Sequence, residues 1–219
     1  MERELSLHLK NISLNLNGKP LILPFLLKIA AGEIVTLMGP SGCGKSSLLS
    51  YLGGDLAAPL RGQGDIILNG NPVNTIRPEQ RRIGRLFQDD LLFPHMTVAE
   101  NLLFAIQRRP RSEREAMMKT ALQRAELEGF ENRPPHTLSG GQRSRISLMR
   151  TLLTKPQAML LDEPFNKLDR ELREQVRNYT FAHLKERNVP TLLVTHDQND
   201  APSGGRILQI TKTGEVKHV

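Results

Sequence analysis

The sequence predicts an α/β protein with one phosphate-binding core and a helical lobe inserted into it. A short apolar run at residues 33–38 is followed by a glycine-rich loop and then by a helical pattern at residues 46–52. From about residue 91 to residue 127 the periodicity is helical, and apolar strand patterns return at residues 158–161 and 191–195. Strands that alternate with helices in this way predict an α/β core.

The glycine-rich loop carries the strongest chemical signal in the chain. In order it reads Gly39, Pro40, Ser41, Gly42, Cys43, Gly44, Lys45, Ser46 and Ser47. Up to Ser46 this is a Walker A pattern, in which backbone N–H groups turn inward around phosphate oxygens, the lysine reaches the terminal phosphates and the serine hydroxyl reaches Mg2+. The strand before the loop and the helix N-terminus after it complete an anion site. We therefore expect a bound nucleotide with Mg2+ here, and Cys43 as a loop position rather than a metal ligand.

Composition restricts the class of protein. The 219 residues, of which 38% are hydrophobic, suffice for one α/β core with a subsidiary lobe. No apolar run approaches the roughly 20 residues that span a bilayer, and the N-terminus lacks the h-region of a signal peptide. With one cysteine, the chain fits a reducing, cytosolic compartment. The net charge of +7 fits a solvated basic face, an anionic membrane surface or nucleic acid, and with no Trp and two Tyr, nucleic acid is the weaker partner.

The expected elements follow in order along the chain. Strand patterns lie at residues 5–38, 64–70, 83–88, 158–161 and 191–195, with a tight turn after the second of them. Helical periodicity lies at residues 98–105, 112–127 and 141–154. We expect Thr97 and Ser112 to cap the first two of these helices. No internal repeat or low-complexity segment is present.

Two acidic residues follow the apolar strand at residues 158–161. Asp162 at the strand end can accept a hydrogen bond from water bound to Mg2+, and Glu163 can orient or deprotonate a water for in-line attack. Taken alone, the pair also fits an ordinary strand that runs into an acidic loop, but the upstream phosphate loop favours the chemical interpretation. His196 follows the next strand and should emerge at the same sheet edge, where it can contact a γ-phosphate. Neither His196 nor Gln88, at the end of the strand at residues 83–88, would point to chemistry without these neighbours.

Together these residues resemble the ATP-binding subunits of ABC transporters, in particular the binding-protein-dependent importer branch. The motifs occur in the expected order over nearly the whole chain: Walker A at 39–46, a Q-loop at Gln88, the signature at 138–142, Walker B at 158–163, a D-loop at 166–169 and an H-loop at His196. The signature Leu-Ser-Gly-Gly-Gln discriminates, because P-loop kinases and GTPases share the Walker motifs but lack it.

The resemblance implies both architecture and domain bounds. It implies a P-loop NTPase core with a mixed parallel sheet, an antiparallel β subdomain and an inserted α-helical subdomain. Residues 1–219 would form a single ABC-type ATPase domain, with residues 1–88 and 139–219 as the nucleotide-binding core and about 89–138 as the helical subdomain.

The resemblance also implies the roles of particular residues. Glu163, His196 and Gln88 would serve catalysis, and Ser46, Gln88 and Asp162 would hold Mg2+. The cofactor would be ATP, bound in a head-to-tail homodimer in which the signature of one subunit faces the nucleotide of the other. The residues that would contribute at this seam are Ser139, Gly140, Gly141, Gln142 and Asp169.

The implied work cycle couples ATP to transport. Dimer closure on ATP and opening after hydrolysis would be passed through the Gln88 region and the helical lobe to an integral membrane permease. The chain would lie at the cytoplasmic face of the inner (plasma) membrane, and a solute-binding protein would be a further partner. Import is favoured. The alternatives are an exporter or lipid-extracting complex, and a soluble ABC-type ATPase that acts on nucleic acid, the ribosome or metal-cluster assembly.

Four departures from the family pattern stand out. Residues 16–20 hold no aromatic ring to stack on adenine, which predicts weak ATP affinity and poor discrimination against GTP, with Leu16 in place of the usual ring. Ser47 replaces a common Thr and should be harmless. Asn166 and Lys167 replace the usual Ser-Ala of the D-loop. Pro202 and the glycines within residues 201–206 should break a helix there, and with the chain ending at Val219 we expect no regulatory appendage.

Overall fold

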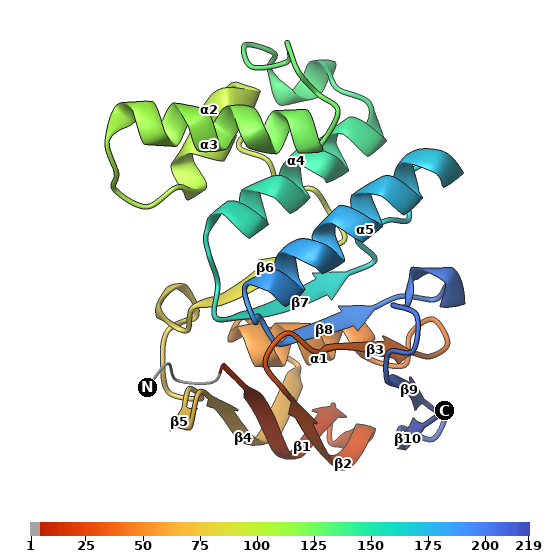
Figure 1. The fold of residues 1–219 in the computed structure, drawn as a ribbon. Helices are drawn as coiled ribbons and strands as arrows, with labels where there is room; N and C mark the ends of the chain where they lie inside the picture. The colour runs from red at the N-terminus through yellow and green to blue at the C-terminus, as the bar shows by residue number, and fades with distance from the viewer. Residues whose placement is uncertain (1–4) are drawn as a thin grey trace. The chain divides into compact units, whose positions relative to one another are not determined.

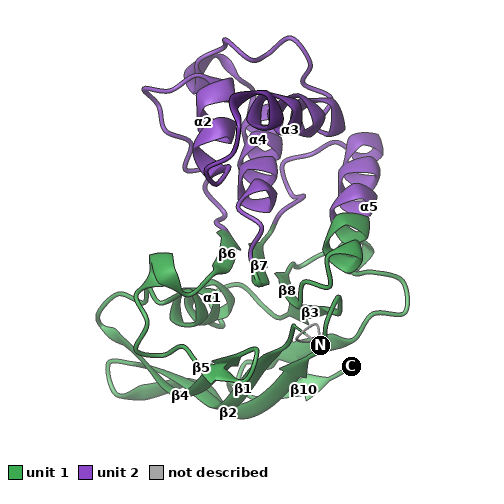
Figure 2. Cartoon of the chain, turned by 60° about the vertical axis from the view of Figure 1, so that its left-hand side comes forward, with its two compact units in different colours: residues 1–85, 157–163, 181–219 green, residues 86–156, 164–180 purple. Residues whose placement is uncertain are grey.

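The computed structural model describes residues 5–219, which fall into two compact units (Figure 2). Unit 1 contains the residues up to 85 together with 157–163 and 181–219, and unit 2 contains residues 86–156 and 164–180. The first four residues, part of the N-terminus expected to lack a signal peptide, lie outside the described residues. Within the described chain, no helix has the length and apolar character to cross a membrane. The helical stretch expected at about 89–138 falls inside unit 2.

Unit 1 contains an antiparallel sheet of four strands in the order β2–β1–β4–β5 (Figure 1). The strands are β1 Leu7–Leu16, β2 Lys19–Ile29, β4 Leu60–Leu68 and β5 Asn71–Pro72. Two Asn-Gly pairs make its tight turns: Asn17 and Gly18 have φ of 51° and 79°, and Asn69 and Gly70 have φ of 52° and 81°. Both central residues of such a turn need positive φ, which Asn and Gly tolerate best. The turn expected after residues 64–70 is therefore present.

A second sheet has six strands in the order β10–β9–β3–β8–β7–β6. The strands are β3 Ile34–Met38, β6 Ile83–Leu86, β7 Ala158–Asp162, β8 Thr191–Val194, β9 Ile207–Ile210 and β10 Val216–His218. β3 pairs in parallel with β8 and β9, β7 pairs in parallel with β8, and β10 pairs antiparallel with β9. Every residue of β7 and β8 is buried, as expected for parallel strands covered on both faces. The mixed sheet beside a separate antiparallel sheet confirms the predicted fold class.

Helix α1, Lys45–Gly53, follows β3 and packs on the core of unit 1. Its buried residues are Leu48, Leu49 and Leu52, which belong to one apolar cluster with side chains of both sheets, including Leu7, Ile66 and Leu160. Gly54 ends the helix in the left-handed region, at φ 92°, where glycine is favoured. The helix predicted from residues 46–52 and its glycine stop are thus confirmed.

Unit 2 is helical. Its helices are α2 Val98–Ala105, α3 Arg111–Arg124, α4 Gly140–Leu153 and the greater part of α5 Arg170–Glu186. Short 3-10 turns lie at η1 Pro78–Gln80 and η3 Gln198–Asp200 in unit 1, and at η2 Pro135–Thr137 in unit 2. The sequence analysis did not predict α5, β9 or β10. Residues 201–206 form turns and bends, so the predicted interruption there is confirmed.

The helix caps confirm one expectation and correct another. Thr97 caps α2 in a capping box with Glu100, as predicted. Ser112 does not cap α3, because the helix already begins at Arg111 behind Pro110, which leaves Ser112 inside the first turn. At α4 the cap is Ser139, whose Oγ accepts from the backbone N of Gln142, so the helix begins one residue before the predicted Gly141.

Candidate functional site

The phosphate loop runs from the end of β3 into the start of α1. Gly44 is the N-cap of α1 with φ 97°, and a Cβ at this position would lie 3.0 Å from the Leu21 side chain. Both the left-handed backbone and the close neighbour therefore favour glycine here. Nζ of Lys45 donates to the carbonyl oxygens of Gly39 at 2.8 Å and Pro40 at 2.9 Å. The ammonium group thus lies over its own loop, next to the backbone N–H groups at the start of α1.

The two predicted carboxylates lie at the carboxyl end of β7, which pairs in parallel with β8. The backbone N of Glu163 donates to the carbonyl oxygen of Val194 at 2.9 Å, which extends the β7–β8 ladder by one residue. Glu163 has φ 50°, in the left-handed region that residues with a Cβ rarely adopt. Asp162, the last residue of β7, is 3% exposed. The two neighbouring acids therefore have different environments, one buried and one turned out of the strand.

Asp162 lies in a buried environment at this end of β7. Its Oδ1 is buried and has no hydrogen-bond partner among the described residues. Burial raises the pKa of the Asp162 carboxyl, against the lowering effects of a hydrogen bond with the Ser46 side chain and of the positive charges of Arg85 and Lys45. The structure thus holds a carboxylate where its charged form is disfavoured, which is a feature common at functional sites.

Glu163 and His196 contact each other directly. Both carboxylate oxygens of Glu163 lie 2.8 Å from Nδ1 of His196. An ionised carboxylate only accepts hydrogen bonds, so in a contact with ionised Glu163 the donor is Nδ1–H of His196. The His196 side chain is 67% exposed and that of Glu163 is 12% exposed. The pair can therefore meet a ligand from solvent while the glutamate stays largely shielded.

The loop that carries His196 is anchored by two residues that the sequence analysis missed. Thr195 Oγ1, which is buried, donates to Oδ2 of buried Asp200 at 2.8 Å and accepts from the backbone N of Asp197 at 3.1 Å. These bonds fix the backbone on both sides of His196. The sequence offered only weak signals for them, because a Thr and an Asp five residues apart are common in loops.

The remaining predicted residues lie in unit 2. The signature residues form the cap and first turn of α4, where the backbone N of Ser139 donates to Oε1 of Gln142 at 2.8 Å. Gly140 and Gly141 are its first two residues. Oδ1 of Asp169 accepts from the backbone N of Leu172 at 3.1 Å, at the start of α5. Gln88 is exposed in the segment that follows β6.

That segment is held by a buried amide, which the sequence analysis also missed. Asn101 on α2 is fully buried, and its Oδ1 accepts from the backbone N of Phe93 at 2.9 Å. Its Nδ2 donates to the carbonyl oxygens of Phe93 at 3.1 Å and Thr97 at 3.0 Å. Asn101 therefore anchors the chain at Phe93 and Thr97, between Gln88 and α2.

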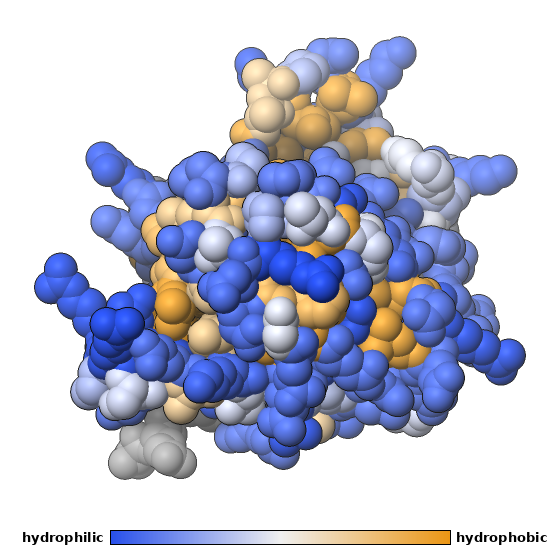
Figure 3. Space-filling model, turned by 90° about the horizontal axis from the view of Figure 1, so that it is seen from above, coloured by the Kyte–Doolittle hydropathy of each residue, from blue (hydrophilic) through white to orange (hydrophobic). Residues whose placement is uncertain are grey.

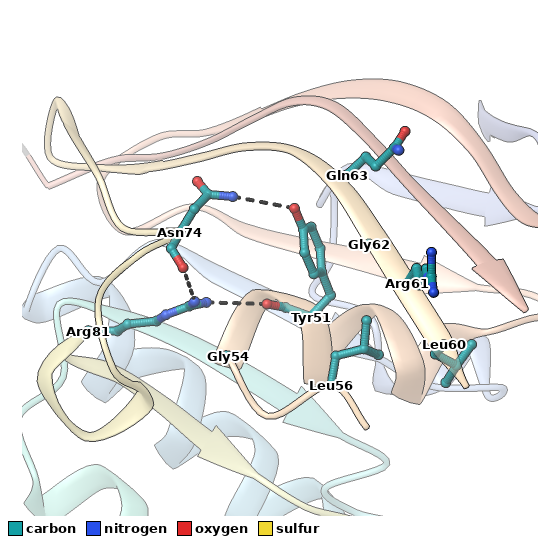
Figure 4. A pocket seen from close by; sticks show the side chains of 9 residues that line it. All are labelled: Tyr51, Gly54, Leu56, Leu60, Arg61, Gly62, Gln63, Asn74 and Arg81. Atoms are coloured by element: carbon teal, nitrogen blue, oxygen red, sulfur yellow. Dashed lines mark hydrogen bonds between the residues drawn. The ribbon is translucent and has the colours of Figure 1, made fainter. Parts of the chain in front are cut away.

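A cavity of about 410 Å³ lies in unit 1 around the C-terminal end of α1 (Figure 4). Its walls are Tyr51, Gly54, Leu56, Leu60, Arg61, Gly62, Gln63, Asn74 and Arg81. The guanidinium of buried Arg81 donates to the carbonyls of Leu52 at 2.9 Å, Asn74 at 2.8 Å and Ile76 at 2.9 Å. Arg81 thus satisfies the carboxyl end of α1. None of the predicted site residues lines this cavity, which lies at the opposite end of α1 from the phosphate loop.

Comparison with known proteins agrees with this geometry. The family model for the ABC transporter family matches residues 24–166. Over 207 residues the chain is 42% identical to the uncharacterized ABC transporter ATP-binding protein YnjD of Escherichia coli (strain K12), covering 94% of this chain and 95% of the relative. It is 36% identical to the spermidine/putrescine import ATP-binding protein PotA of Clostridium novyi (strain NT), covering 97% of this chain and 61% of the relative. It is 37% identical to the sulfate/thiosulfate import ATP-binding protein CysA of Halalkalibacterium halodurans, covering 98% of this chain and 61% of the relative.

Solved structures give the same result. The dimeric structure of MJ0796, a bacterial ABC transporter cassette, matches with a TM-score of 0.84 at 31% identity and covers 96% of both chains. A second MJ0796 structure, of a post-hydrolysis state bound to ADP and Pi, matches with a TM-score of 0.84 at 32% identity and covers 97% of both chains. The family match, the length of the matched chain and the Walker and signature motifs agree, and the chain therefore belongs to the ABC transporter family, as an ATP-binding subunit that hydrolyses ATP.

Proposed function

We propose that this chain drives solute import as a head-to-tail homodimer bound to a membrane permease at the cytoplasmic face of the inner (plasma) membrane, with a solute-binding protein on the other side. Two curated relatives of 36% and 37% identity are import ATP-binding proteins. The matched MJ0796 structures are dimeric. The chain spans only 61% of these two import relatives, so their solutes are not carried over.

The observation that carries the catalytic assignment is the contact between Glu163 and His196 at 2.8 Å. Glu163 accepts a proton from the water that attacks the γ-phosphorus, while the bond to ADP breaks and inorganic phosphate forms. His196 holds the carboxylate through Nδ1–H, and its Nε2 side faces the phosphate. Lys45 and the backbone N–H groups of the loop at residues 39–47, Pro40 excepted, bind the phosphates. The second copy closes the site from the other side with its signature residues Ser139, Gly140, Gly141 and Gln142, and its Asp169 lies near the dimer interface. Gln88 passes the nucleotide state of the dimer on to the permease.

The residues of unit 1 fit a Mg2+ ion. Asp162 offers a buried oxygen without a partner, and Ser46 lies in hydrogen-bonding contact with the same carboxyl group. No cluster of three or more His, Cys, Asp or Glu side chains suited to a metal occurs among the described residues. Mg2+ in nucleotide sites needs no such cluster, because it takes one or two protein oxygens together with phosphate oxygens and water. Ser46 and Asp162 would hold the ion, which would neutralise charge on the phosphates.

Unit 2 offers exposed apolar side chains for a permease. Leu91 is 54% exposed and Phe104 is 64% exposed, both near the segment that follows Gln88. The ring centroids of Phe93 and Phe104 are 4.9 Å apart, so the segment after Gln88 contacts the C-terminal part of α2. Figure 3 shows a largely hydrophilic surface that apolar patches interrupt. Exposed apolar groups of this kind favour contact with another protein, and Leu91 lies close to Gln88 in the sequence.

The test uses Glu163→Gln, with Glu79→Gln at an exposed position of unit 1 as the matched control. We expect Glu163→Gln to lose hydrolysis by at least about 100-fold, the usual size of a general-base effect. We also expect it to keep ATP binding and to dimerise in ATP, measured by light scattering, while Glu79→Gln behaves as the unmodified protein. Hydrolysis by Glu163→Gln at the normal rate would overturn the catalytic assignment.

The transport assignment needs a partner experiment. Tagged Glu163→Gln protein is purified from detergent-solubilised native membranes, with untagged protein as the control, and the co-purifying proteins are identified by mass spectrometry. A multi-span permease supports transport, and a solute-binding protein encoded or purified with it supports import over export. Ribosomes or nucleic acid in place of a permease would overturn the proposal in favour of the soluble ATPase.

A further inference from the structure

Lys167 joins two segments of unit 2 that are far apart in the sequence. Its Nζ donates to the backbone carbonyl of Gln88 at 3.0 Å and to Oδ1 of Asp90 at 3.1 Å. Oδ2 of Asp90 lies 3.4 Å from Nε of Arg143, in the first turn of α4. Lys167 also approaches α4 through its backbone, because a Cβ added to Gly141 would lie 3.0 Å from the Lys167 carbonyl oxygen. One residue of the D-loop thus contacts both the Q-loop segment and the signature helix.

These contacts are more protected than most surface ion pairs. The Asp90 side chain is 12% exposed, against 33% for Lys167 and 38% for Arg143. Each carboxylate oxygen of Asp90 faces a different cation, and the ammonium of Lys167 has three donors, of which the two bonds above use two. Hydrogen bonds between charged groups are stronger than neutral ones and are screened less where they are partly buried.

The residue type matters at this position. Small residues such as the usual Ser-Ala of the D-loop cannot reach a carbonyl and a carboxylate in another segment, whereas the four-carbon stem of lysine can. Without the ammonium group, Asp90 would keep only Arg143 of these two cations, and the carbonyl of Gln88 would lose this donor. Gln88 is exposed, so the bond from Lys167 to its carbonyl oxygen helps to fix the backbone position from which the Gln88 side chain extends.

We propose that Lys167 is a positioning residue for ATP hydrolysis, which fixes residues 88–90 against the start of α4 so that Gln88 and the signature residues 138–142 move together. The inference rests on the proposed function, because it uses the roles proposed there for Gln88 and the signature. A shift of residues 88–90 in response to the γ-phosphate would then move the signature residues 138–142 as well, because both segments belong to unit 2. The replacement of the usual D-loop Ser-Ala by Asn166 and Lys167 would therefore couple the movement of these two segments and would not be a neutral change.

The test compares Lys167→Met, which keeps the stem and removes the charge and donors, with Lys167→Arg and with Lys119→Met. Lys119 is exposed on α3 in the same unit and serves as the matched control. Because misplacing a positioned group lowers kcat, we expect Lys167→Met to reduce kcat by about tenfold, with KM for ATP within about twofold. Lys167→Arg should recover at least about half of the lost rate, because it keeps the charge and donors.

A second readout follows the two segments themselves. In hydrogen–deuterium exchange of the nucleotide-free chain, we expect faster exchange in residues 88–90 and 139–143 of Lys167→Met and no change in Lys119→Met. The melting temperature should stay within about 2 °C, since the Lys167 side chain is 33% exposed and a single ion pair of this kind contributes little to global stability. A purely structural role would instead lower the melting temperature together with the rate.

Two results would overturn the inference. One is a kcat for Lys167→Met equal to that of Lys119→Met, and the other is a rate loss that tracks a lower melting temperature and is not recovered by Lys167→Arg. The assay uses the isolated chain, so it does not depend on a permease. Gln88→Ala and Ser139→Ala are measured beside it: if both lose activity while Lys167→Met does not, only the Lys167 inference fails, whereas full activity in both would refute the proposed roles beneath it.

Discussion

Replacing Asp162 with asparagine should stabilise the nucleotide-free protein while it destroys the enzyme. The carboxyl is 3% exposed, its Oδ1 has no partner among the described residues, and burial raises its pKa despite Ser46, Arg85 and Lys45. A raised pKa means that folding disfavours the charged form, so the ionised group costs stability at neutral pH. Asparagine has nearly the same shape and no charge.

The magnitude follows from the charge on the unpaired oxygen. A buried polar atom without a partner costs about 1–3 kcal/mol, and a charged one costs more. Asparagine keeps a polar atom there and removes only the extra cost of the charge, part of which is offset because the variant loses the attraction of Arg85 and Lys45. We therefore expect a net gain of about 1 kcal/mol, which for a chain of this length raises the melting temperature by about 2–4 °C. Asp65→Asn, at an exposed position of β4, is the control and should leave the melting temperature unchanged.

The sign of the pH dependence is also fixed. Because the folded pKa of Asp162 lies above its ordinary value of 3.8, the contribution of this group to stability is fully present below 3.8 and is lost as the pH rises through the folded pKa. The advantage of Asp162→Asn should therefore be largest at pH 7 to 8 and should shrink as the pH is lowered toward 4. Differential scanning fluorimetry across this range measures it.

Ligand should reverse the order of stability. With ATP and Mg2+ at about 100 times the dissociation constant, binding stabilises the wild-type protein by about 2.7 kcal/mol, and Asp162→Asn should gain less. A variant that melts at or below the wild-type temperature without ligand, or an advantage that grows as the pH falls, would refute the reasoning from burial.

Four further predictions concern single positions. Leu16→Tyr, at the exposed end of β1, should tighten ATP binding by about 5- to 100-fold if base stacking is what the chain lacks; calorimetric titration with ATP and GTP measures this, and no gain would count against it. Saturating ATP should slow alkylation of Cys43 in the phosphate loop, followed by mass spectrometry, and equal rates would contradict it. Gly62→Ala should cost about 1–3 kcal/mol in denaturant unfolding, because its Cβ would lie 2.2 Å from the Tyr51 ring; an unchanged midpoint would show that the ring can move. His196→Ala should lower kcat by at least about 100-fold with no change in melting temperature, since its side chain is 67% exposed, and a normal rate would remove His196 from the mechanism.

Local sequence patterns predicted much of the fold where several independent signals indicated the same element. The run at residues 33–38 became β3 and the glycine-rich loop led into α1, since strand, turn and helix signals there agreed. Thr97 capped α2 as predicted because Glu100 completes a capping box. Ser112 had no such partner, and Pro110 set the start of α3 instead. Helix α5 is amphipathic, with a clear helical pattern, but it was not predicted; it carries none of the nucleotide-binding motifs.

The site shows a different limit. The sequence placed Asp162, Glu163 and His196 at one sheet edge, and parallel pairing of β7 and β8 brought Glu163 and His196 into contact. The support of the loop that carries His196 was not predictable, because Thr195–Asp200 is a single contact with no periodicity, and the same holds for Asn101–Phe93 within unit 2. Such contacts depend on how loops close in three dimensions.

The two acidic residues explain why those supports are needed. Asp162 is a buried carboxylate with an unpartnered oxygen, and Glu163 has a left-handed backbone with φ 50°. Each feature costs about 1–3 kcal/mol. Asp162→Asn would remove the buried charge, and Glu163→Gly would relieve the backbone strain. Neither replacement keeps the carboxylates that a cation and an attacking water require, so the cost is inseparable from the chemistry. It must be offset by the surrounding fold, and the fully buried strands β7 and β8, with the Glu163–Val194 backbone bond between them, hold both residues in place. The stability gain expected for Asp162→Asn is thus a direct measure of what this sheet edge gives up for catalysis.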